Sequence, residues 1–184
     1  MTRRLPIPQP TMMVGPGASA RLGQAIGGFG HHKVLLVTDA VVSRLGLTAG
    51  LTEALTASGT EFVTFDEVTP DAPIPLVEAG IALYQRAGCD AIVAFGGGSV
   101  MDAAKAIGLL ATNGGDIREY FGADRIKKPL PPLIAIPTTC GTGSEVTQFT
   151  VITDTEKHFK MGIGSPHNIP KVAVVDPTLL AKLP

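Results

Sequence analysis

The sequence predicts an α/β protein: a Rossmann-like parallel sheet flanked by helices, with a β-rich C-terminal edge. Two observations predict this class. Short apolar runs, typical of strands buried on both faces of a parallel sheet, alternate with helical segments over the first two-thirds of the chain. The last third holds short strand-like segments separated by turns. A length of 184 residues fits one domain, so residues 1–184 are expected to form a single unit.

The first part of the chain is expected to form strands and helices in turn. Apolar runs such as 33–38 and 91–95 are typical of buried strands, and glycines end the helical segments between them. Strands are therefore expected over 11–14, 33–38, 61–65, 91–95 and 133–136. Helices are expected over 18–26, 41–57, 75–87 and 100–112. This alternation requires right-handed crossovers and places helices on both faces of the sheet.

The last third is expected to form the β-rich edge. Three short strands are predicted over 149–152, 159–163 and 172–175, with turns and no helices between them. A hairpin turn is expected around Asp154, Thr155 and Glu156.

Composition excludes several classes of partner. Lys plus Arg is 15 and Asp plus Glu is 16, which gives a net charge of −1 and no basic surface for nucleic acid. No apolar run approaches the length of a membrane span, and the first ten residues lack the apolar core of a secretory signal. Cys89 and Cys140 are too far apart in the sequence for a zinc-type pair. A cytoplasmic protein without a nucleic-acid or membrane partner is expected.

The strongest motif is the glycine triplet with serine at 96–99, which follows a predicted buried strand. Glycines allow a ligand to approach the backbone closely, and the N-terminus of the next helix favours an anion such as a pyrophosphate. Ser99 is expected to cap that helix with Asp102 at the third helical position, as in a capping box. A tight turn before a well-capped helix is the alternative interpretation.

Asp39 follows another predicted buried strand. A carboxylate at the tip of a parallel strand can accept hydrogen bonds from the adenosine ribose, and it would repel a 2′-phosphate. The residue therefore favours NAD over NADP. Capping of the helix that begins near Val41 is the alternative, and both roles are compatible.

A second polar loop at 137–145 also follows a predicted buried strand. Thr138, Thr139 and Thr142 supply hydroxyl groups, and Thr142 with Glu145 matches a capping box that predicts another helix. Because ligands bind outside the carboxyl ends of strands in open α/β sheets, both loops are expected to form one nucleotide site. A polar loop with a cap is the alternative.

Other reactive side chains have simpler interpretations. Cys140 is expected to be a small buried thiol, since no His–carboxylate pair lies near it in the sequence. Lys105 is expected to form a local ion pair with Asp102, three residues earlier. Lys160 by itself is expected to be a solvated side chain. No metal site is expected, because the four histidines lack ligand spacing; they are His31, His32, His158 and His167.

Two segments together resemble one known family. GGGSVMDAAK at 96–105 and PTTCGTGSE at 137–145 resemble the iron-containing (group III) alcohol dehydrogenases, which include lactaldehyde reductase, 1,3-propanediol dehydrogenase and butanol dehydrogenases. The resemblance extends over essentially the whole chain, from Asp39 to the VVDP segment at 174–177. It implies a dinucleotide-binding N-terminal domain with the dehydroquinate-synthase-like fold.

The resemblance also implies roles for individual residues. Asp39 would meet the adenosine ribose, and the segment 97–99 would hold the pyrophosphate. The threonines at 138, 139 and 142 would surround the adenine and the nearby phosphate, and Val151 and Lys160 would lie near the nicotinamide ribose. The full set of predicted coenzyme-binding residues is Asp39, Gly97, Gly98, Ser99, Asp102, Thr138, Thr139, Thr142, Val151 and Lys160.

The implied reaction is hydride transfer between NAD(H) and a primary alcohol or aldehyde in a homo-oligomeric enzyme. In this family an all-helical domain follows and binds Fe²⁺ or Zn²⁺ through one Asp and three His. The chain ends at Pro184, before such a domain, so little or no dehydrogenase activity is expected of these residues alone. A stand-alone nucleotide-binding or self-assembling module is the alternative.

Overall fold

The computed structural model describes residues 8–28, 30 and 32–181, and its main feature is a six-stranded, all-parallel sheet. Its strand order is β1-β9-β6-β4-β2-β3. The strands are β1 (Thr11–Val14), β2 (Lys33–Val37), β3 (Glu61–Phe65), β4 (Ala91–Gly96), β6 (Leu133–Pro137) and β9 (Val172–Val175). Every residue of the central strands β4 and β6 is buried, which explains their uninterrupted apolar sequences.

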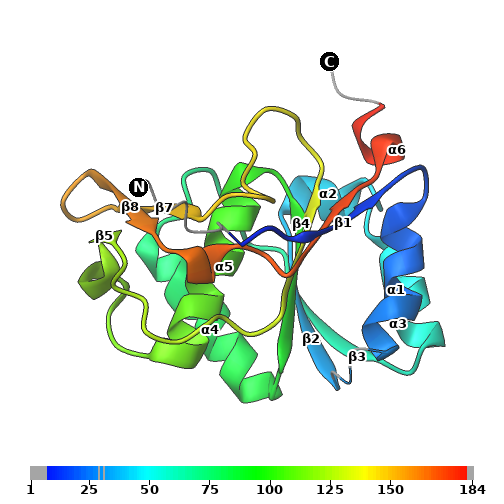
Figure 1. Cartoon of the computed structure of the whole chain (residues 1–184), viewed down its shortest axis with the longest axis horizontal. Coiled ribbons are helices and arrows are strands. Elements are labelled where there is room, and N and C mark those ends of the chain that lie inside the picture. The colour runs from blue at the N-terminus through cyan, green and yellow to red at the C-terminus, as the bar shows by residue number, and fades with distance from the viewer. Residues whose placement is uncertain (1–7, 29, 31, 182–184) are drawn as a thin grey trace, which may run out of the picture.

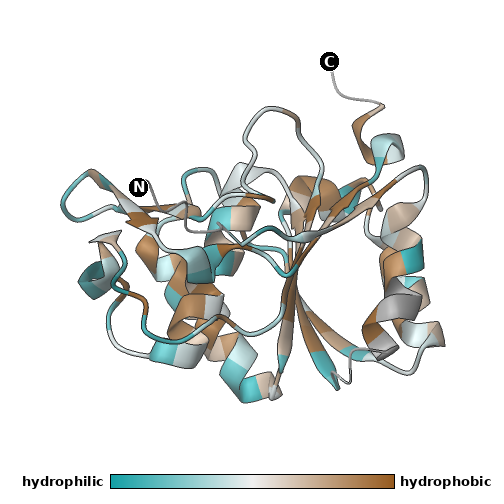
Figure 2. Ribbon diagram, viewed as in Figure 1, coloured by the Kyte–Doolittle hydropathy of each residue, from teal (hydrophilic) through white to brown (hydrophobic). Residues whose placement is uncertain are grey.

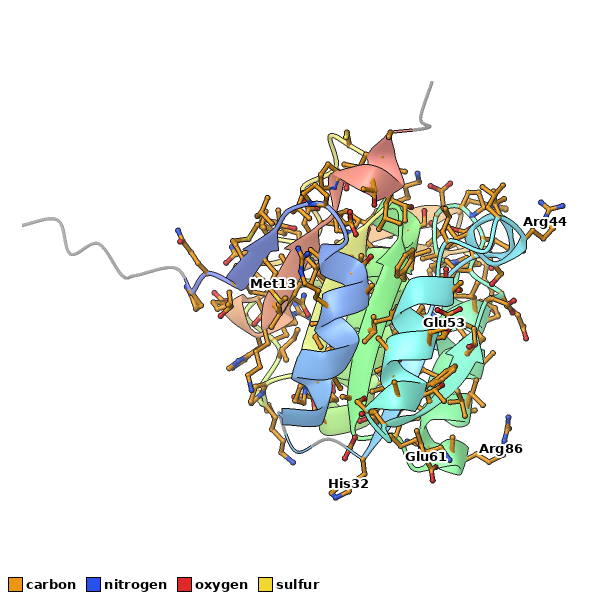
Figure 3. All side chains as sticks on the ribbon, turned by 90° about the vertical axis from the view of Figure 1, so that its right-hand side faces the viewer. Met13, His32, Arg44, Glu53, Glu61 and Arg86 are labelled. Atoms are coloured by element: carbon orange, nitrogen blue, oxygen red, sulfur yellow. The ribbon has the colours of Figure 1, made fainter. Side chains whose placement is uncertain are left out.

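Helices cover both faces of this sheet (Figure 1). Helices α1 (Ala18–Gly28) and α3 (Ala49–Ala57) pack side by side on one face, as Figure 3 also shows. Helices α4 (Ile74–Ala87) and α5 (Gly98–Asn113) pack together on the other. Each face therefore has its own apolar core, and Figure 2 shows the strands between the two cores as largely hydrophobic.

A second, three-stranded sheet lies beside α5, in the order β5-β8-β7. Its strands are β5 (Gly122–Ala123), β7 (Phe149–Asp154) and β8 (Phe159–Gly164). Strands β7 and β8 form an antiparallel hairpin whose turn begins after Asp154, as the sequence predicts. Short helical segments complete the chain at Ile117–Tyr120, Pro166–Asn168 and α6 (Pro177–Leu180). The one at Pro166–Asn168 lies between β8 and β9, where no helix was expected; it begins after Ser165, whose Oγ accepts from His167 N.

The expected helix over 41–57 is wrong, because the segment forms two helices. Helix α2 (Ala40–Arg44) ends at Leu45, and α3 begins only at Ala49. Between them Gly46 has a φ of +66°, a left-handed conformation that interrupts a right-handed helix.

The expected place of the strand at 172–175 is also wrong. It does not extend the β-rich edge but lies inside the parallel sheet, paired with β1 on one side and β6 on the other. Its residues Val172, Ala173 and Val174 are buried. The other predicted helices and strands are found with ends shifted by at most two residues. None of the described helices is both long and apolar enough to cross a membrane.

Asp176, directly after β9, ties three elements together. Its carboxylate accepts hydrogen bonds from Gly17 N (3.1 Å), Ser19 N (3.2 Å) and Ser19 Oγ (2.7 Å) at the start of α1. It also accepts from Thr178 N (3.1 Å) and Thr178 Oγ1 (2.6 Å) at the start of α6. Burial alone would raise the pKa of Asp176, but the bonds from Thr178 and Ser19 outweigh burial and lower it to about 2.

Candidate functional site

A cleft of about 860 Å³ lies where β2, β4 and β6 end, at their carboxyl termini. Side chains and backbone from five regions line it: α2 and its flanks, the segment after β3, each of the two polar loops, and α6. The lining residues are Asp39, Ala40, Val41, Val42, Leu45, Gly46, Leu47, Val68, Thr69, Pro70, Gly97, Gly98, Ser99, Val100, Thr138, Thr139, Thr178 and Leu179. This is the edge at which open parallel α/β sheets bind ligands.

The glycine loop meets the second loop closely. Gly97 caps α5 with extended backbone, and the helix begins at Gly98. A Cβ at Gly97 would lie 3.3 Å from Thr139, and one at Gly98 would lie 3.1 Å from Cγ2 of Thr142. The backbone at Gly97 is open to any residue, since its φ is −84°. A Cβ at either position would require the neighbouring threonine to shift by a few tenths of an ångström, so glycine keeps this space open and does not serve an unusual dihedral angle at Gly97.

The predicted capping box at Ser99 is wrong. The helix begins one residue before Ser99, so Ser99 lies inside the first turn, and its Oγ accepts from Asp71 N at 3.1 Å. Asp71 also accepts from Lys160 Nζ at 2.7 Å, with both side chains more than half exposed. Lys160 is therefore solvated, as expected, but it is paired with Asp71 and is not a lone cation. This chain of contacts links the glycine loop to β8.

Asp39 has the alternative role that the sequence left open. Its Oδ1 accepts from Val41 N and Val42 N, both at 2.9 Å, and so caps α2. Asp39 also lines the cleft. Both backbone bonds go to Oδ1, so Oδ2 retains acceptor capacity for a ligand. The ribose-binding role stays a prediction, and it is compatible with the cap.

The second loop lacks the predicted helix. Residues 138–148 form bends and turns, with Ser144 N donating to Thr142 Oγ1 at 3.4 Å. Gly141 and Gly143 have φ of +99° and +65°, outside the range of a right-handed helix. The prediction of a buried Cys140 is also wrong, because this residue is exposed; Cys89 is the buried one.

Asp102 and Lys105 do not form the expected local ion pair. Lys105 is fully buried, and its Nζ donates to the carbonyl oxygens of Thr147 (2.9 Å) and Phe149 (2.8 Å). Burial lowers the pKa of Lys105 to about 8, although the charges of Asp102 and Glu145 oppose this shift. Burial raises the pKa of Asp102 to about 6, against the effects of the Lys105 charge and a backbone hydrogen bond from Val151.

The ten predicted residues thus fall into two groups. Six line the cleft: Asp39, Gly97, Gly98, Ser99, Thr138 and Thr139. The other four lie beside it: Thr142 contacts the glycine loop, Asp102 and Val151 join α5 to β7, and Lys160 on β8 bonds to Asp71. The structure brings both groups to the N-terminal end of α5.

Sequence reasoning missed the apolar wall of the cleft. Val41 and Leu45 on α2 are 54% and 67% exposed, and they line the cleft with Leu179 of α6. Such exposure of large apolar side chains fits a surface that a flat, partly apolar ligand covers. No local pattern marks them, because only folding brings α2 and α6 to the same edge.

The histidines give no metal centre in the part of the chain that the structure describes. His32 is exposed and contacts Asp90, while His158 and His167 are also exposed. His31 lies outside the described residues. No group of three or more His, Cys, Asp or Glu residues within 8–28, 30 and 32–181 is arranged to hold a metal ion.

Known proteins resemble this chain over nearly its whole length. The family model described as iron-containing alcohol dehydrogenase matches residues 9–177. Choline dehydrogenase of Bacillus subtilis is 45% identical over 92% of this chain and 43% of its own length. A crystal structure of 1,3-propanediol oxidoreductase matches with a TM-score of 0.94 and 38% identity, over 99% of this chain and 48% of that one.

A structure with bound coenzyme is also similar. Sulfoacetaldehyde reductase from Bifidobacterium kashiwanohense, in complex with NAD⁺, matches with a TM-score of 0.85 and 31% identity. The match covers 100% of this chain and 49% of that one. The chain thus spans about half the length of the relatives it matches.

Proposed function

We propose a function from one premise, that this chain belongs to the iron-containing alcohol dehydrogenase family. It forms the coenzyme-binding side of an oxidoreductase that transfers hydride between NAD(H) and a primary alcohol or aldehyde. The observation that carries this proposal is the cleft in which Asp39, the glycine loop and Thr138 lie together at the carboxyl edge of a parallel sheet.

The cleft fits a dinucleotide in shape and chemistry. The glycine loop at 97–98 leaves room for a phosphate against the N-terminus of α5, a helix of sixteen residues whose dipole favours an anion. Asp39 at the tip of β2 can accept the hydroxyl groups of the adenosine ribose. The apolar wall formed by Val41, Leu45 and Leu179 supports placement of a flat base.

The remaining predicted residues extend the site from the pyrophosphate toward the small sheet. Val151 and Lys160 lie on the neighbouring strands β7 and β8. Lys160 donates to Asp71, whose backbone N–H donates to Ser99 next to the glycine loop, so its positive charge is linked to that loop. We assign this region to the nicotinamide end. Related proteins named for choline, propanediol and sulfoacetaldehyde support an alcohol or aldehyde as the hydride partner.

The described residues do not fit a metal ion, because no cluster of ligating side chains is present among them. No catalytic step is therefore assigned to a metal held by these residues. Their proposed work is to bind the coenzyme, orient it and select NAD over NADP.

The test is calorimetric titration of the 184-residue chain with NAD⁺ and with NADP⁺. Saturable NAD⁺ binding and much weaker NADP⁺ binding are expected, because the Asp39 carboxylate repels a 2′-phosphate. Asp39→Asn keeps a cap acceptor for α2 but removes the charge, so it should narrow the difference between the two coenzymes.

Glu53→Ala is the matched control, because Glu53 is an exposed carboxylate on α3 (Figure 3). It should bind both coenzymes as the wild type does. Failure of the wild-type chain to bind either coenzyme, while folded by circular dichroism, would overturn the proposal. Equal affinity for NAD⁺ and NADP⁺ would overturn the assigned role of Asp39 alone.

A further inference from the structure

Lys105 is a buried cation that the proposed binding of coenzyme does not use directly. It lies on α5 two turns after the glycine loop, and none of its side-chain surface is exposed. Its Nζ donates to the carbonyl oxygens of Thr147 at 2.9 Å and Phe149 at 2.8 Å, with Thr147 Oγ1 at 3.5 Å. Both carbonyl groups belong to the junction between the second loop and β7.

The preceding turn of α5 holds the same segment. The carbonyl oxygen of Asp102 accepts from Thr150 Oγ1 at 2.8 Å. Its carboxylate is also stabilised by a hydrogen bond from the Val151 backbone. Residues 147–151 are therefore attached at several consecutive positions to the helix that begins at the glycine loop, and β7 packs on that helix (Figure 1).

A buried ammonium group is an expensive way to fill this space. Desolvation disfavours its charge, and an apolar side chain of similar length would avoid that cost. What an apolar side chain lacks is the ability to donate hydrogen bonds to two backbone carbonyl groups, that of Thr147 in the second loop and that of Phe149 at the start of β7. The choice of lysine thus indicates a need to hold the segment in one place.

We propose that Lys105 is a positioning residue that holds Thr147–Phe149 so that β7 forms a wall beside the nicotinamide half of the coenzyme. This inference rests on the proposed function. The adenosine half depends on a different set of contacts, since Asp39, Val41 and Leu179 line the cleft from α2 and α6. Lys105 should therefore affect the two halves of the coenzyme unequally.

The experiment compares NAD⁺ with ADP, which has the adenosine and pyrophosphate but lacks the nicotinamide riboside. Both are titrated into the 184-residue chain and its Lys105→Met variant by calorimetry. The variant should bind NAD⁺ about tenfold more weakly, which corresponds to about 1.4 kcal/mol. Its affinity for ADP should change by less than about twofold, well within 1 kcal/mol.

Three further variants sharpen the test. Lys105→Arg retains the positive charge and the N–H donors, so its NAD⁺ affinity should be close to that of the wild type. If Lys105→Met does not fold, the comparison of NAD⁺ with ADP is made on Lys105→Arg. Thr147→Val removes only the 3.5 Å contact and keeps the carbonyl group, so it should behave as wild type. Lys128→Met, at an exposed position, is the control for loss of a positive charge.

Two results would overturn the inference. One is wild-type NAD⁺ affinity in folded Lys105→Met, and the other is an equal loss for NAD⁺ and ADP, which would indicate a general structural role. Failure of the proposed function is distinguishable from both, because the wild-type chain itself would then bind neither ligand.

Discussion

The six-stranded sheet and the three-stranded sheet are held in the molecule by different interactions. Parallel hydrogen-bond ladders and two apolar cores hold the large sheet, and the carboxylates at its edge are satisfied by N–H and O–H donors. The small sheet also buries apolar residues against α5, but charged groups join it to the rest: Lys105, Asp102 and the pair of Lys160 with Asp71.

This difference between the two sheets also appears in the pKa values of their carboxylates. Asp176 at the edge of the large sheet has a lowered pKa because donors surround it. Asp102 at the junction with the small sheet has a raised pKa, mainly because it is desolvated. Two carboxylates of this chain should thus affect its stability with opposite signs.

The largest expected effect tests the large-sheet cleft at Gly98. Gly98→Ala would place a Cβ 3.1 Å from Thr142 Cγ2 and would narrow the space for a phosphate. We expect NAD⁺ affinity to fall about 100-fold, or about 2.7 kcal/mol, by calorimetry. Adding Thr142→Ser removes the contacting methyl group and should not restore binding. Recovery in the double variant would show that glycine serves contact between the loops and not the ligand.

The next largest effect is expected on stability, at Asp176, whose carboxylate accepts hydrogen bonds at the edge of the large sheet. Asp176→Asn should lower the free energy of unfolding by roughly 2 kcal/mol at pH 7, since the folded pKa lies nearly two units below its usual value. Because the pKa of Asp176 is lower in the folded state, its ionised carboxylate stabilises the fold at pH values above 3.8, the pKa in the unfolded state. This stabilisation is lost as the pH falls toward 2.

Urea unfolding at pH 7 and pH 3 measures this difference, with Asp66→Asn, an exposed residue, as the control. The gap between wild type and Asp176→Asn should shrink at pH 3. A gap that does not depend on pH would indicate that shape, and not charge, makes Asp176 stabilising.

Asp102→Asn should have a smaller effect of the opposite sign. The folded pKa of about 6 lies above the unfolded value of 3.8, so the ionised carboxylate destabilises the folded state increasingly as pH rises through that window. The variant should be about 1 kcal/mol more stable than wild type at pH 8, with no advantage below pH 4. A less stable variant at pH 8 would mean that attraction to Lys105 exceeds the desolvation cost.

The smallest effect is expected for the exposed ion pair between Lys160 of the small sheet and Asp71, in the segment between β3 and α4. Lys160 and Asp71 are 61% and 58% exposed at their side chains, so solvent and salt screen their attraction. A double-mutant cycle of Lys160→Met and Asp71→Asn should give a coupling energy of about 0.5 kcal/mol, reduced in 1 M salt. A coupling energy that 1 M salt leaves unchanged would contradict this prediction, because it would mean that solvent does not screen the pair.

Local sequence was informative wherever one short segment determines the structure. The apolar run of β4 followed by three glycines predicted a buried strand, a tight turn and a helix; β4 ends at Gly96 and α5 begins at Gly98, so Gly97 alone forms the turn. The capping boxes failed because a cap depends on where the helix begins. Gly98 already belongs to α5, and the left-handed Gly143 prevents a helix after Thr142.

The sequence by itself determined the alternation of strands and helices, the two loops at strand ends and the family resemblance, because these depend on neighbouring residues. Tertiary structure alone decided the rest. It placed β9 between β1 and β6, brought the apolar residues of α2 and α6 to one cleft, and directed Lys105 to carbonyl groups more than forty residues away. Such contacts join residues that are distant in the chain, so no local period or propensity encodes them.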